Sequence, residues 1–494
     1  MIAIVRRLIL FPVLLVLLLS SCSSPQSDTI RFGLASMPAN VDPRYATDAA
    51  STRIGRLIFE RLVDFNEKML PIPALADWQQ QSPTHYVFTL RHASRFHHGG
   101  ALTSRDIKAT YEYILNEKNA SPHRGSLSII QEIRAPNEQT IEFILTRPDP
   151  LFPAYLVIGI LPADLQAKDH RFEREPVGSG PFRFVDWPEE GRLRLQRSAD
   201  KQNVEFINVP NPTVRVLKLM RGELDIMQND IPPELINYLV KNHDVNIQHS
   251  KGANYAYLGF NLEDPILGRL EVRQAIAHGI NRDEIIHYVF GDSARVANAL
   301  LPPTHWAGHN NLVSYQYDPQ KARQLLQQAG VKLPLELSYK TSNDPFRIRI
   351  ATILQSQMEQ IGVHVNIQSY DWGTFYGDIK SGRFQLFSLA WVGIKTPDIY
   401  RYVFHSASTP PDGANRGRFT DKEIDQLIEE AEKFSDLQKQ AEVYRRLQEK
   451  IHANLPYVPL WYEDNVLISR KNISNYRLPV DGDYDGLILA NKTP

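Results

Sequence analysis

Three neighbouring histidines are the first side chains in this sequence that could do chemistry. His92, His97 and His98 lie close together, and imidazole is a common metal ligand. Adjacent residues on an extended strand point to opposite faces, so His97 and His98 cannot chelate one ion together without a bend. The segment also supplies no convergent carboxylate or thiolate, which a metal site would need. We therefore expect no metal here.

The motifs that mark common enzyme active sites are absent from the sequence. It contains no GxSxG, GxxxxGKS/T, HExxH or GxGxxG pattern, and no nucleophile–base pair can be argued from it. Gly178 and Gly180 could be mistaken for part of a phosphate-binding loop, but the lysine of such a loop is missing and Pro181 lacks a backbone donor. A tight turn between two strands is the better interpretation. We expect a protein that is not an enzyme and needs no cofactor.

Composition and charge exclude further classes of protein. The 494 residues are 43% hydrophobic and 22% charged, which is enough for a large core and more than one domain. The 55 Lys and Arg residues are balanced by 56 Asp and Glu residues, so no excess positive charge is available to bind a phosphate backbone. Nucleic acid is therefore not an expected partner. The one cysteine, Cys22, excludes an intramolecular disulfide, a CxxC redox pair and a thiolate zinc cluster.

The first residues have the pattern of an export signal. Arg6 and Arg7 precede a mostly apolar, uncharged run at 8–19, and small residues follow it. The run is shorter than the roughly 20 apolar residues that a membrane helix needs. We expect residues 1–21 to be a signal peptide and the protein to be exported.

A short run at the end of this segment gives Cys22 a role. Leu19-Ser20-Ser21-Cys22 resembles a bacterial lipobox, in which the chain is cut before a cysteine that then receives a lipid. An ordinary signal peptide with an incidental cysteine is the alternative. Residues 22–28 would form the lipidated cysteine and a polar tether. We expect the protein in the periplasm, or on the outer face of a Gram-positive cell, anchored to the membrane through Cys22.

Strand and helix signals alternate along the chain. Residues 335–339 alternate like a strand, 347–361 carry apolar residues on one helical face, and 363–367 alternate again, which predicts a βαβ unit with a parallel strand pair. Two α/β lobes fit the whole pattern better than one. Further strands are expected at Ile30–Leu34 and 86–90, and helices after Thr103, over 281–290, after Asp318 and within the amphipathic stretch 421–452.

An ordered series of short motifs spans most of the chain. The motifs are YVFTLR at 86–91, FHHGG at 96–100, LTSRDI at 102–107, PVGSGPF at 176–182, GELDI at 222–226, VRQAI at 272–276, GINR at 279–282, YDP at 317–319, the segment 382–391 and PYVPL at 456–460. Their types and order resemble the family 5 extracellular solute-binding proteins, the peptide and nickel receptors of ABC importers. Most members have an acid where this chain has His98.

The resemblance implies an α/β fold, a two-lobe periplasmic-binding-protein clamshell with an extra N-terminal subdomain of the cluster C type. Hinge crossings near Asn261 and Leu460 would let the lobes close over a ligand. The expected partners are a short peptide or related small solute and the permease subunits of an ABC transporter, and we expect a monomer. The implied boundaries are 29–60, 172–261 and 463–494 for lobe I, 61–171 for the extra subdomain of lobe I, and 262–462 for lobe II.

The resemblance also implies positions that contact the ligand, although each could instead pack the core or cap a loop. They are Ser36, Met37, Pro38, His123, Tyr255, Tyr257, Trp372, Trp391, Val392 and Gly393.

One position departs from the peptide receptors that the chain resembles. In them a carboxylate shortly after the tryptophan pairs with the amino terminus of the ligand, and that position here is Ile394. Asp398 could substitute only if the loop is rearranged. The expected function is capture of a short peptide or peptide-like solute for a membrane permease. A glycan, a cation or a metal complex as the solute, or a surface interaction protein without a transport role, are the alternatives.

Overall fold

One mixed sheet of eleven strands runs through both lobes. The computed structural model describes residues 28–493 except positions 190, 243–244, 292, 412 and 435, so Cys22 and the predicted signal peptide lie outside the described residues. The strand order is β15 (Val363–Tyr370), β14 (Leu335–Ser342), β16 (Leu386–Trp391), β12 (Val245–Phe260), β17 (Tyr457–Arg470), β11 (Ile226–Gln228), β1 (Ile30–Leu34), β10 (Asn203–Asn208), β9 (Arg192–Arg197) and β8 (Phe182–Glu189), with β13 (Ala294–Val296) paired to β17.

Lobe I contains the strands from β11 to β8. The predicted strand Ile30–Leu34 is confirmed, and it pairs in parallel with both β10 and β11. Phe32 of this strand packs against Phe206 and against Tyr484 from the end of the chain, so the C-terminal segment belongs to the lobe I core. The helices and short elements of this lobe are α2 (Ala49–Ile58), α6 (Pro212–Met220), α7 (Pro233–Asn242), β18 (Ile473–Ser474), η3 (Asp485–Ile488) and β19 (Asn491–Lys492).

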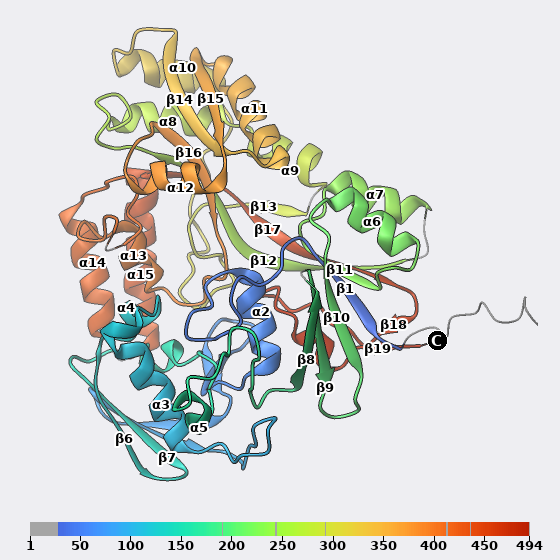
Figure 1. The fold of residues 1–494 in the computed structure, drawn as a ribbon. Helices are drawn as coiled ribbons and strands as arrows, with labels where there is room; N and C mark the ends of the chain where they lie inside the picture. The colour runs from blue at the N-terminus through green and yellow to red at the C-terminus, as the bar shows by residue number, and fades with distance from the viewer. Residues whose placement is uncertain are drawn as a thin grey trace, which may run out of the picture.

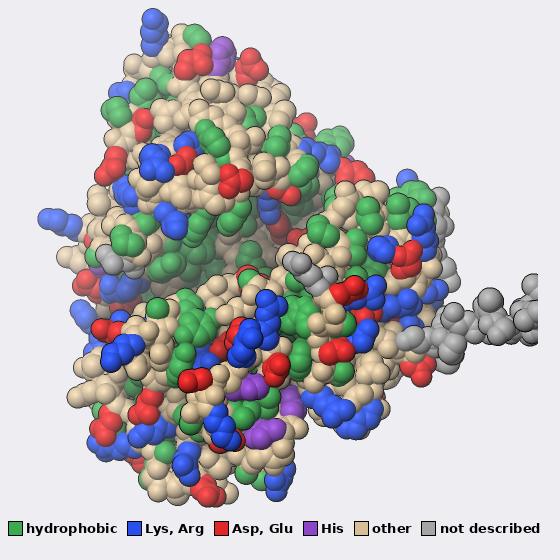
Figure 2. Space-filling view, viewed as in Figure 1, with side chains coloured by type: hydrophobic (Ala, Val, Ile, Leu, Met, Phe, Trp, Pro, Cys, Tyr) green, Lys and Arg blue, Asp and Glu red, His purple; other side chains and the backbone are tan. Residues whose placement is uncertain are grey.

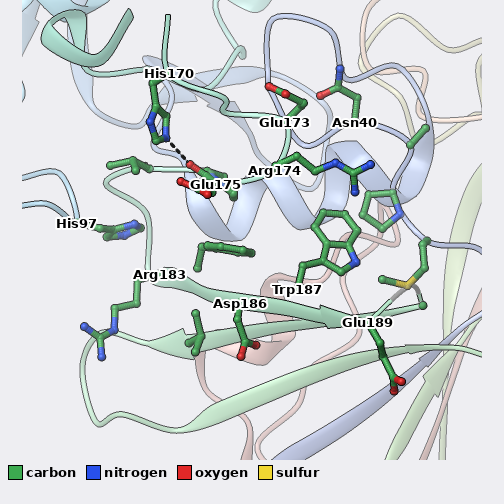
Figure 3. Close-up of a pocket in the computed structure, with 18 of the residues that line it drawn as sticks. Asn40, His97, His170, Glu173, Arg174, Glu175, Arg183, Asp186, Trp187 and Glu189 are labelled. Carbon is green, nitrogen blue, oxygen red and sulfur yellow. Dashed lines mark hydrogen bonds between the residues drawn. The ribbon is translucent and has the colours of Figure 1, made fainter. Parts of the chain in front are cut away.

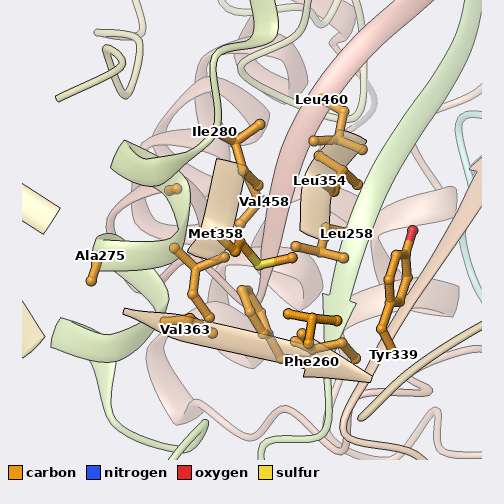
Figure 4. Close-up of a cluster of buried hydrophobic side chains, with 14 of the residues drawn as sticks. Leu258, Phe260, Ala275, Ile280, Tyr339, Leu354, Met358, Val363, Val458 and Leu460 are labelled. Carbon is orange, nitrogen blue, oxygen red and sulfur yellow. The ribbon is translucent and has the colours of Figure 1, made fainter. Parts of the chain in front are cut away.

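Lobe II contains the predicted βαβ unit, which the structure confirms. Strands β14 and β15 pair in parallel with Leu335 opposite Val363, and α11 (Pro345–Glu359) connects them. Leu354 and Met358 of this helix point into a hydrophobic core that also contains Ala275 of α8 (Leu270–Gly279) (Figure 4). In Figure 1 the βαβ unit lies at the top, and β1 and β11 lie below it.

The other predicted helices of lobe II are also present. Asn281 and Asp318 accept hydrogen bonds from backbone N–H groups at the starts of α9 (Arg282–Phe290) and α10 (Pro319–Gln328), which is how an N-cap residue stabilises a helix. The amphipathic stretch 421–452 forms two helices, because Asp436 caps a new one. The remaining helices are α12 (Trp372–Lys380), α13 (Ile399–Phe404), α14 (Lys422–Lys433) and α15 (Leu437–Asn454).

A separate antiparallel sheet lies at the lower left of Figure 1. Its order is β4 (Ala76–Ser82), β5 (His85–Leu90), β7 (Thr140–Leu145) and β6 (Ile130–Asn137), and α3 (Ser104–Leu115) packs on it. The strand predicted at 86–90 and the helix predicted after Thr103 are therefore confirmed. The carboxylate of Asp106 accepts the backbone N–H of Thr103 at 2.8 Å, as in a capping box. The short elements nearby are β2 (Val63–Phe65), β3 (Pro71–Pro73), η1 (Glu117–Asn119), α4 (Arg124–Leu127), η2 (Phe152–Tyr155) and α5 (Ala163–Gln166).

The prediction of a tight turn at Gly178 and Gly180 is wrong. These glycines lie in an irregular segment that leads into β8, and no strand immediately precedes it in the described chain. The backbone N–H of Gly180 donates to the carbonyl oxygen of Ile58 at 2.8 Å, and a Cβ atom at Gly178 would overlap the same oxygen. The glycines are therefore required because the end of α2 approaches the backbone closely.

Strands β12 and β17 connect the two lobes. They pair along their length, but the register shifts between Ser250 and Asn254, where β12 carries a bulge. A Cβ atom at Gly252, inside this bulge, would overlap the carbonyl oxygen of Glu463 on β17. Bulges bend a strand and increase its twist, so the backbone changes direction where the chain passes between the lobes.

Candidate functional site

A cavity of about 460 Å³ lies between the two lobes. Figure 2 shows that the surface is hollowed between the upper lobe and the lower part of the molecule. Lobe I supplies Arg53 of α2 and Asp230, which follows β11, and lobe II supplies Arg347 of α11 and Val392, which follows β16. The cavity thus lies at the carboxyl ends of β11 and β16, where open α/β sheets place their ligands.

The described groups around the cavity carry charges of both signs. Arg347 Nη1 lies 3.3 Å from Glu463 Oε1, and the charge of Glu463 raises the pKa of Arg347. Arg215, which also lines the cavity, is buried and donates to the carbonyl oxygens of Val209 and Asp230. Burial lowers the pKa of Arg215. Both Arg215 and Arg347 place a positive charge at the cavity wall.

Asp230 is held in the wall by an unusual backbone. Asn229 and Asp230 both have positive φ angles, of 60° and 53°, which non-glycine residues adopt at a cost of about 1–3 kcal/mol and which cluster at functional sites. The side chain of Asn229 accepts the N–H of Val466 at 2.9 Å and donates to Asn465 at 3.0 Å, which fixes this turn. Burial raises the pKa of Asp230. The charges of Arg215 and Arg53 act against this effect, although the carboxylate makes no side-chain hydrogen bond or close ion pair with the described residues.

Two of the predicted ligand contacts lie at this cavity or beside it. Val392 lines the cavity, and Gly393 follows with a positive φ angle of 73°. Trp391 is half-buried behind them, with the guanidinium carbon of Arg416 4.7 Å from the centre of its ring. Ile394 packs against the core of lobe II. The position that we expected to approach an amino terminus is therefore apolar.

The predicted tyrosines are buried in the core of lobe II. Tyr257 has no exposed surface, and its ring stacks on that of Tyr457 at 4.2 Å. Its hydroxyl accepts a hydrogen bond from Arg416 at 3.0 Å. Tyr255 is equally enclosed and stacks on Tyr257. The structure gives both side chains packing partners, and their contact with a ligand stays a prediction.

The other predicted contacts are dispersed. Trp372 is 58% exposed and stacks on Tyr376 at 5.4 Å. His123 Nε2 lies 3.1 Å from the carbonyl oxygen of Ala46, and burial lowers the pKa of His123. Asp398, the possible substitute carboxylate, accepts a hydrogen bond from Thr396, and burial raises its pKa. The structure does not bring these side chains together.

Met37 and Pro38 line a second cavity, of about 1230 Å³, that lies within lobe I (Figure 3), whereas Ser36 is exposed. Here Arg174 lies over the ring of Trp187, and His170 Nε2 is 2.6 Å from the carbonyl oxygen of Glu175. Across the described residues, no group of three or more His, Cys, Asp or Glu side chains is placed to hold a metal ion. This cavity is built from one lobe, whereas the cavity of about 460 Å³ has walls from both lobes.

Sequence reasoning did not identify the charged side chains of the interlobe cavity. Arg53, Arg347 and Glu463 lie in ordinary amphipathic or buried segments that carry no local signal. Asp230 had one available signal, because it follows the GELDI strand at 222–226 and precedes two prolines, so it ends a strand of the expected parallel sheet.

Comparisons with known proteins agree with this architecture. The family model for bacterial extracellular solute-binding proteins, family 5 Middle, matches residues 68–413. The dipeptide-binding protein of Escherichia coli K12 is 25% identical over 504 residues, which cover 92% of this chain and 93% of that protein.

Two solved structures have the same fold. NikZ from Campylobacter jejuni in complex with Ni(L-His) has a TM-score of 0.81 at 27% identity, covering 94% of this chain and 99% of that chain. The periplasmic binding protein DppA from Helicobacter pylori, in complex with the peptide STSA, has a TM-score of 0.81 at 25% identity, covering 94% and 98%. The predicted two-lobe clamshell is therefore confirmed, and the chain belongs to the family 5 bacterial extracellular solute-binding proteins.

Proposed function

We propose that this protein is the substrate-binding component of an ABC importer, which captures a short peptide or peptide-like solute between its lobes and delivers it to a membrane permease. The observation that carries the proposal is the interlobe cavity, where charged groups from both lobes face one space. The dipeptide-binding relative of Escherichia coli and the peptide complex of the Helicobacter pylori protein support this class of ligand. The same relatives support a binding role rather than a catalytic one.

The charges of the cavity suit a zwitterion. Asp230 is exposed to the cavity, and its carboxylate makes no side-chain hydrogen bond or close ion pair with the described residues, so it is available to a ligand. The ammonium group of a peptide would pair with Asp230, and its carboxylate would face Arg53 and Arg347. A volume of about 460 Å³ is within the usual range of small-ligand sites, about 300–1,000 Å³.

A non-peptide solute is the second candidate, and Ile394 favours it. This apolar side chain packs on the lobe II core, so the loop after β16 offers no carboxylate to an amino terminus at that position. The solute could then be a glycan, a cation or a metal complex, and the Campylobacter jejuni relative was solved with Ni(L-His).

Closure of the lobes would bend β12 and β17. We place the hinge crossings at the bulge around Gly252 on β12 and at Glu463 on β17. The first of these lies N-terminal to the crossing expected near Asn261. Residues 256–260 of β12 already pack in the lobe II core, which supports this placement.

We also propose that Cys22 carries a lipid and holds the mature protein, as a monomer, at a membrane outside the cytoplasm. The lipobox-like sequence ending at Cys22 supports this, and residues 22–28 would tether the anchor to lobe I. No helix in the part of the chain that the structure describes is long and apolar enough to cross a membrane.

Two measurements test the ligand class. Isothermal titration of the purified protein with pools of di- to pentapeptides should release or absorb heat, and no binding across all pools would contradict the peptide proposal. Native mass spectrometry of protein purified without refolding should show a co-purified peptide mass. A non-peptide mass there would favour the second candidate.

A further inference from the structure

Lys395 joins the two lobes through a pair of carboxylates. Its Nζ atom lies 3.0 Å from Asp481 Oδ2 and 3.3 Å from Asp483 Oδ2. Lys395 directly follows Ile394, which packs on the lobe II core, whereas Asp483 precedes Tyr484, whose ring packs on Phe32 in the lobe I core. The two ion pairs therefore cross from one lobe to the other.

These pairs are shielded from water. The side chains of Lys395 and Asp481 are each 19% exposed, and that of Asp483 is 9% exposed. Burial raises the pKa of Asp483, whereas the charge of Lys395, against the effect of burial, lowers the pKa of Asp481. Removal of one partner from a buried pair is strongly unfavourable because it leaves the other charge uncompensated.

The backbone and the side chain of Lys395 each make one further contact. His305 Nε2 lies 3.1 Å from the carbonyl oxygen of Lys395, and the ammonium group lies 5.4 Å from the centre of the Phe65 ring. The lysine therefore approaches the carboxylates from a fixed backbone, which reduces the entropy that the side chain loses on pairing.

The carboxylates are in turn connected to the ligand cavity. Asp483 Oδ2 lies 2.9 Å from Arg56 Nε, and Asp483 Oδ1 lies 4.0 Å from Arg53 Nε. Arg53 lines the interlobe cavity, whereas Lys395 does not contribute to its wall. Lys395 can thus act on the closure of the cavity without touching its contents.

A second interlobe ion pair provides a comparison. Arg349 of α11 pairs with Glu234 of α7, and these side chains are 44% and 53% exposed. Exposed pairs contribute little because water and salt screen them, whereas shielded pairs are screened far less. Of these two interlobe contacts, the one made by Lys395 is the stronger.

We infer that Lys395 is an interlobe latch: its ion pairs with Asp481 and Asp483 hold the two lobes closed when no ligand is bound. The inference rests on the proposed function only in assuming that the solute binds between the lobes. A ligand that binds only the closed form has an apparent Kd equal to its intrinsic Kd divided by the fraction of protein that is closed. Loss of the latch therefore weakens binding although Lys395 makes no contact with the solute.

The test compares hydrogen exchange in the ligand-free full-length protein. Lys395→Met should increase the exchange rate several-fold at 229–236 and 342–349, the cavity walls of the two lobes. Lys439→Met, an exposed lysine on α15, should have no effect, and Arg349→Met should have a small one. The reversed pair Lys395→Glu with Asp481→Lys should bring the exchange back toward the wild-type rate.

The latch is refuted if Lys395→Met leaves exchange at both cavity walls unchanged, or changes only 394–398 and 479–485. It is also refuted if the reversed pair, folded as judged by circular dichroism, exchanges no more slowly than Lys395→Glu alone. A second arm titrates the di- to pentapeptide pools, where Lys395→Met should weaken binding about tenfold or more. Absence of peptide binding by the wild type would contradict the proposed function, and the exchange measurement would still decide the latch.

Discussion

The imidazole of His305 is fixed as one neutral tautomer against the backbone of Lys395. Its Nε2 atom donates to the carbonyl oxygen of Lys395 at 3.1 Å, and its Nδ1 atom accepts the N–H of Ala307 at 3.0 Å. A protonated ring would lose the acceptor, and the ring is buried. Burial lowers the pKa of His305 to about 4.

The first prediction is that acid destabilises the protein through His305. Above the unfolded-state pKa of 6.5 both states are neutral and the group has no effect. Between 6.5 and about 4 the unfolded state binds a proton that the folded state does not, so the free energy of unfolding falls as the pH falls, by about 3 kcal/mol in total. Chemical denaturation at pH 7.5 and pH 5 should show about 2 kcal/mol of this loss, because the remainder falls between pH 5 and pH 4.

A variant isolates the contribution of His305 from that of other titrating groups. His305→Asn can still donate to the carbonyl oxygen of Lys395 but does not titrate. The difference in unfolding free energy between the two pH values should be smaller in this variant than in the wild type. Equal differences in both proteins would show that His305 does not cause the acid effect.

The second prediction concerns Asp230 and the amino group of the ligand. Asp230→Asn keeps a residue that tolerates a positive φ angle but removes the charge, so binding of a free peptide should weaken about thirtyfold or more. An N-acetylated peptide should bind the wild type as poorly. Isothermal titration provides both values.

A matched control is available at Asp169. This exposed residue also has a positive φ angle, of 51°, and lies outside the interlobe cavity, so Asp169→Asn should bind like the wild type. If Asp230→Asn and the N-acetylated peptide both bind with unchanged affinity, Asp230 does not receive the amino group.

Much of the fold could be predicted because its signals are local. The βαβ unit follows from periodicity within 335–367, and α9 and α10 follow from single capping residues, Asn281 and Asp318. Each signal involves residues that are close in the sequence, so no knowledge of the sheet order is needed.

The charged cavity could not be predicted in this way. Arg53, Asp230 and Glu463 meet only because the sheet places β17 beside β11 and α2 near their ends. Lys395 and Asp483 are likewise 88 residues apart. Such contacts depend on strand order, and hydrophobic periodicity and capping patterns do not specify strand order.

The two tyrosines before the predicted hinge show a related limit. Tyr255 and Tyr257 alternate along β12 as cleft residues could. However, this strand is central, with β16 on one side and β17 on the other, and the side chains are covered in the lobe II core. A central strand that is covered on both faces gives no sequence signal that separates core from cleft.

The third prediction concerns Cys22. In a bacterial host that processes lipoproteins, the wild-type protein should incorporate a labelled fatty acid and sediment with membranes. Cys22→Ala should lose the label, because no thiol remains to accept the lipid. Incorporation of the label by the variant, or its absence from the wild type, would contradict lipidation at this position.

The fourth prediction tests the bulge that joins the lobes. At Gly252 an added Cβ atom would overlap the carbonyl oxygen of Glu463, which is backbone and cannot rotate away. Gly252→Ala should therefore lower the free energy of unfolding by about 1–3 kcal/mol, the usual cost of a forced backbone shift. Gly377→Ala in α12, where an added Cβ atom meets nothing within 4 Å, should be neutral or stabilising by up to about 1 kcal/mol. Denaturant titration compares the two variants, and equal stability would show that the bulge accommodates a side chain without displacing β17.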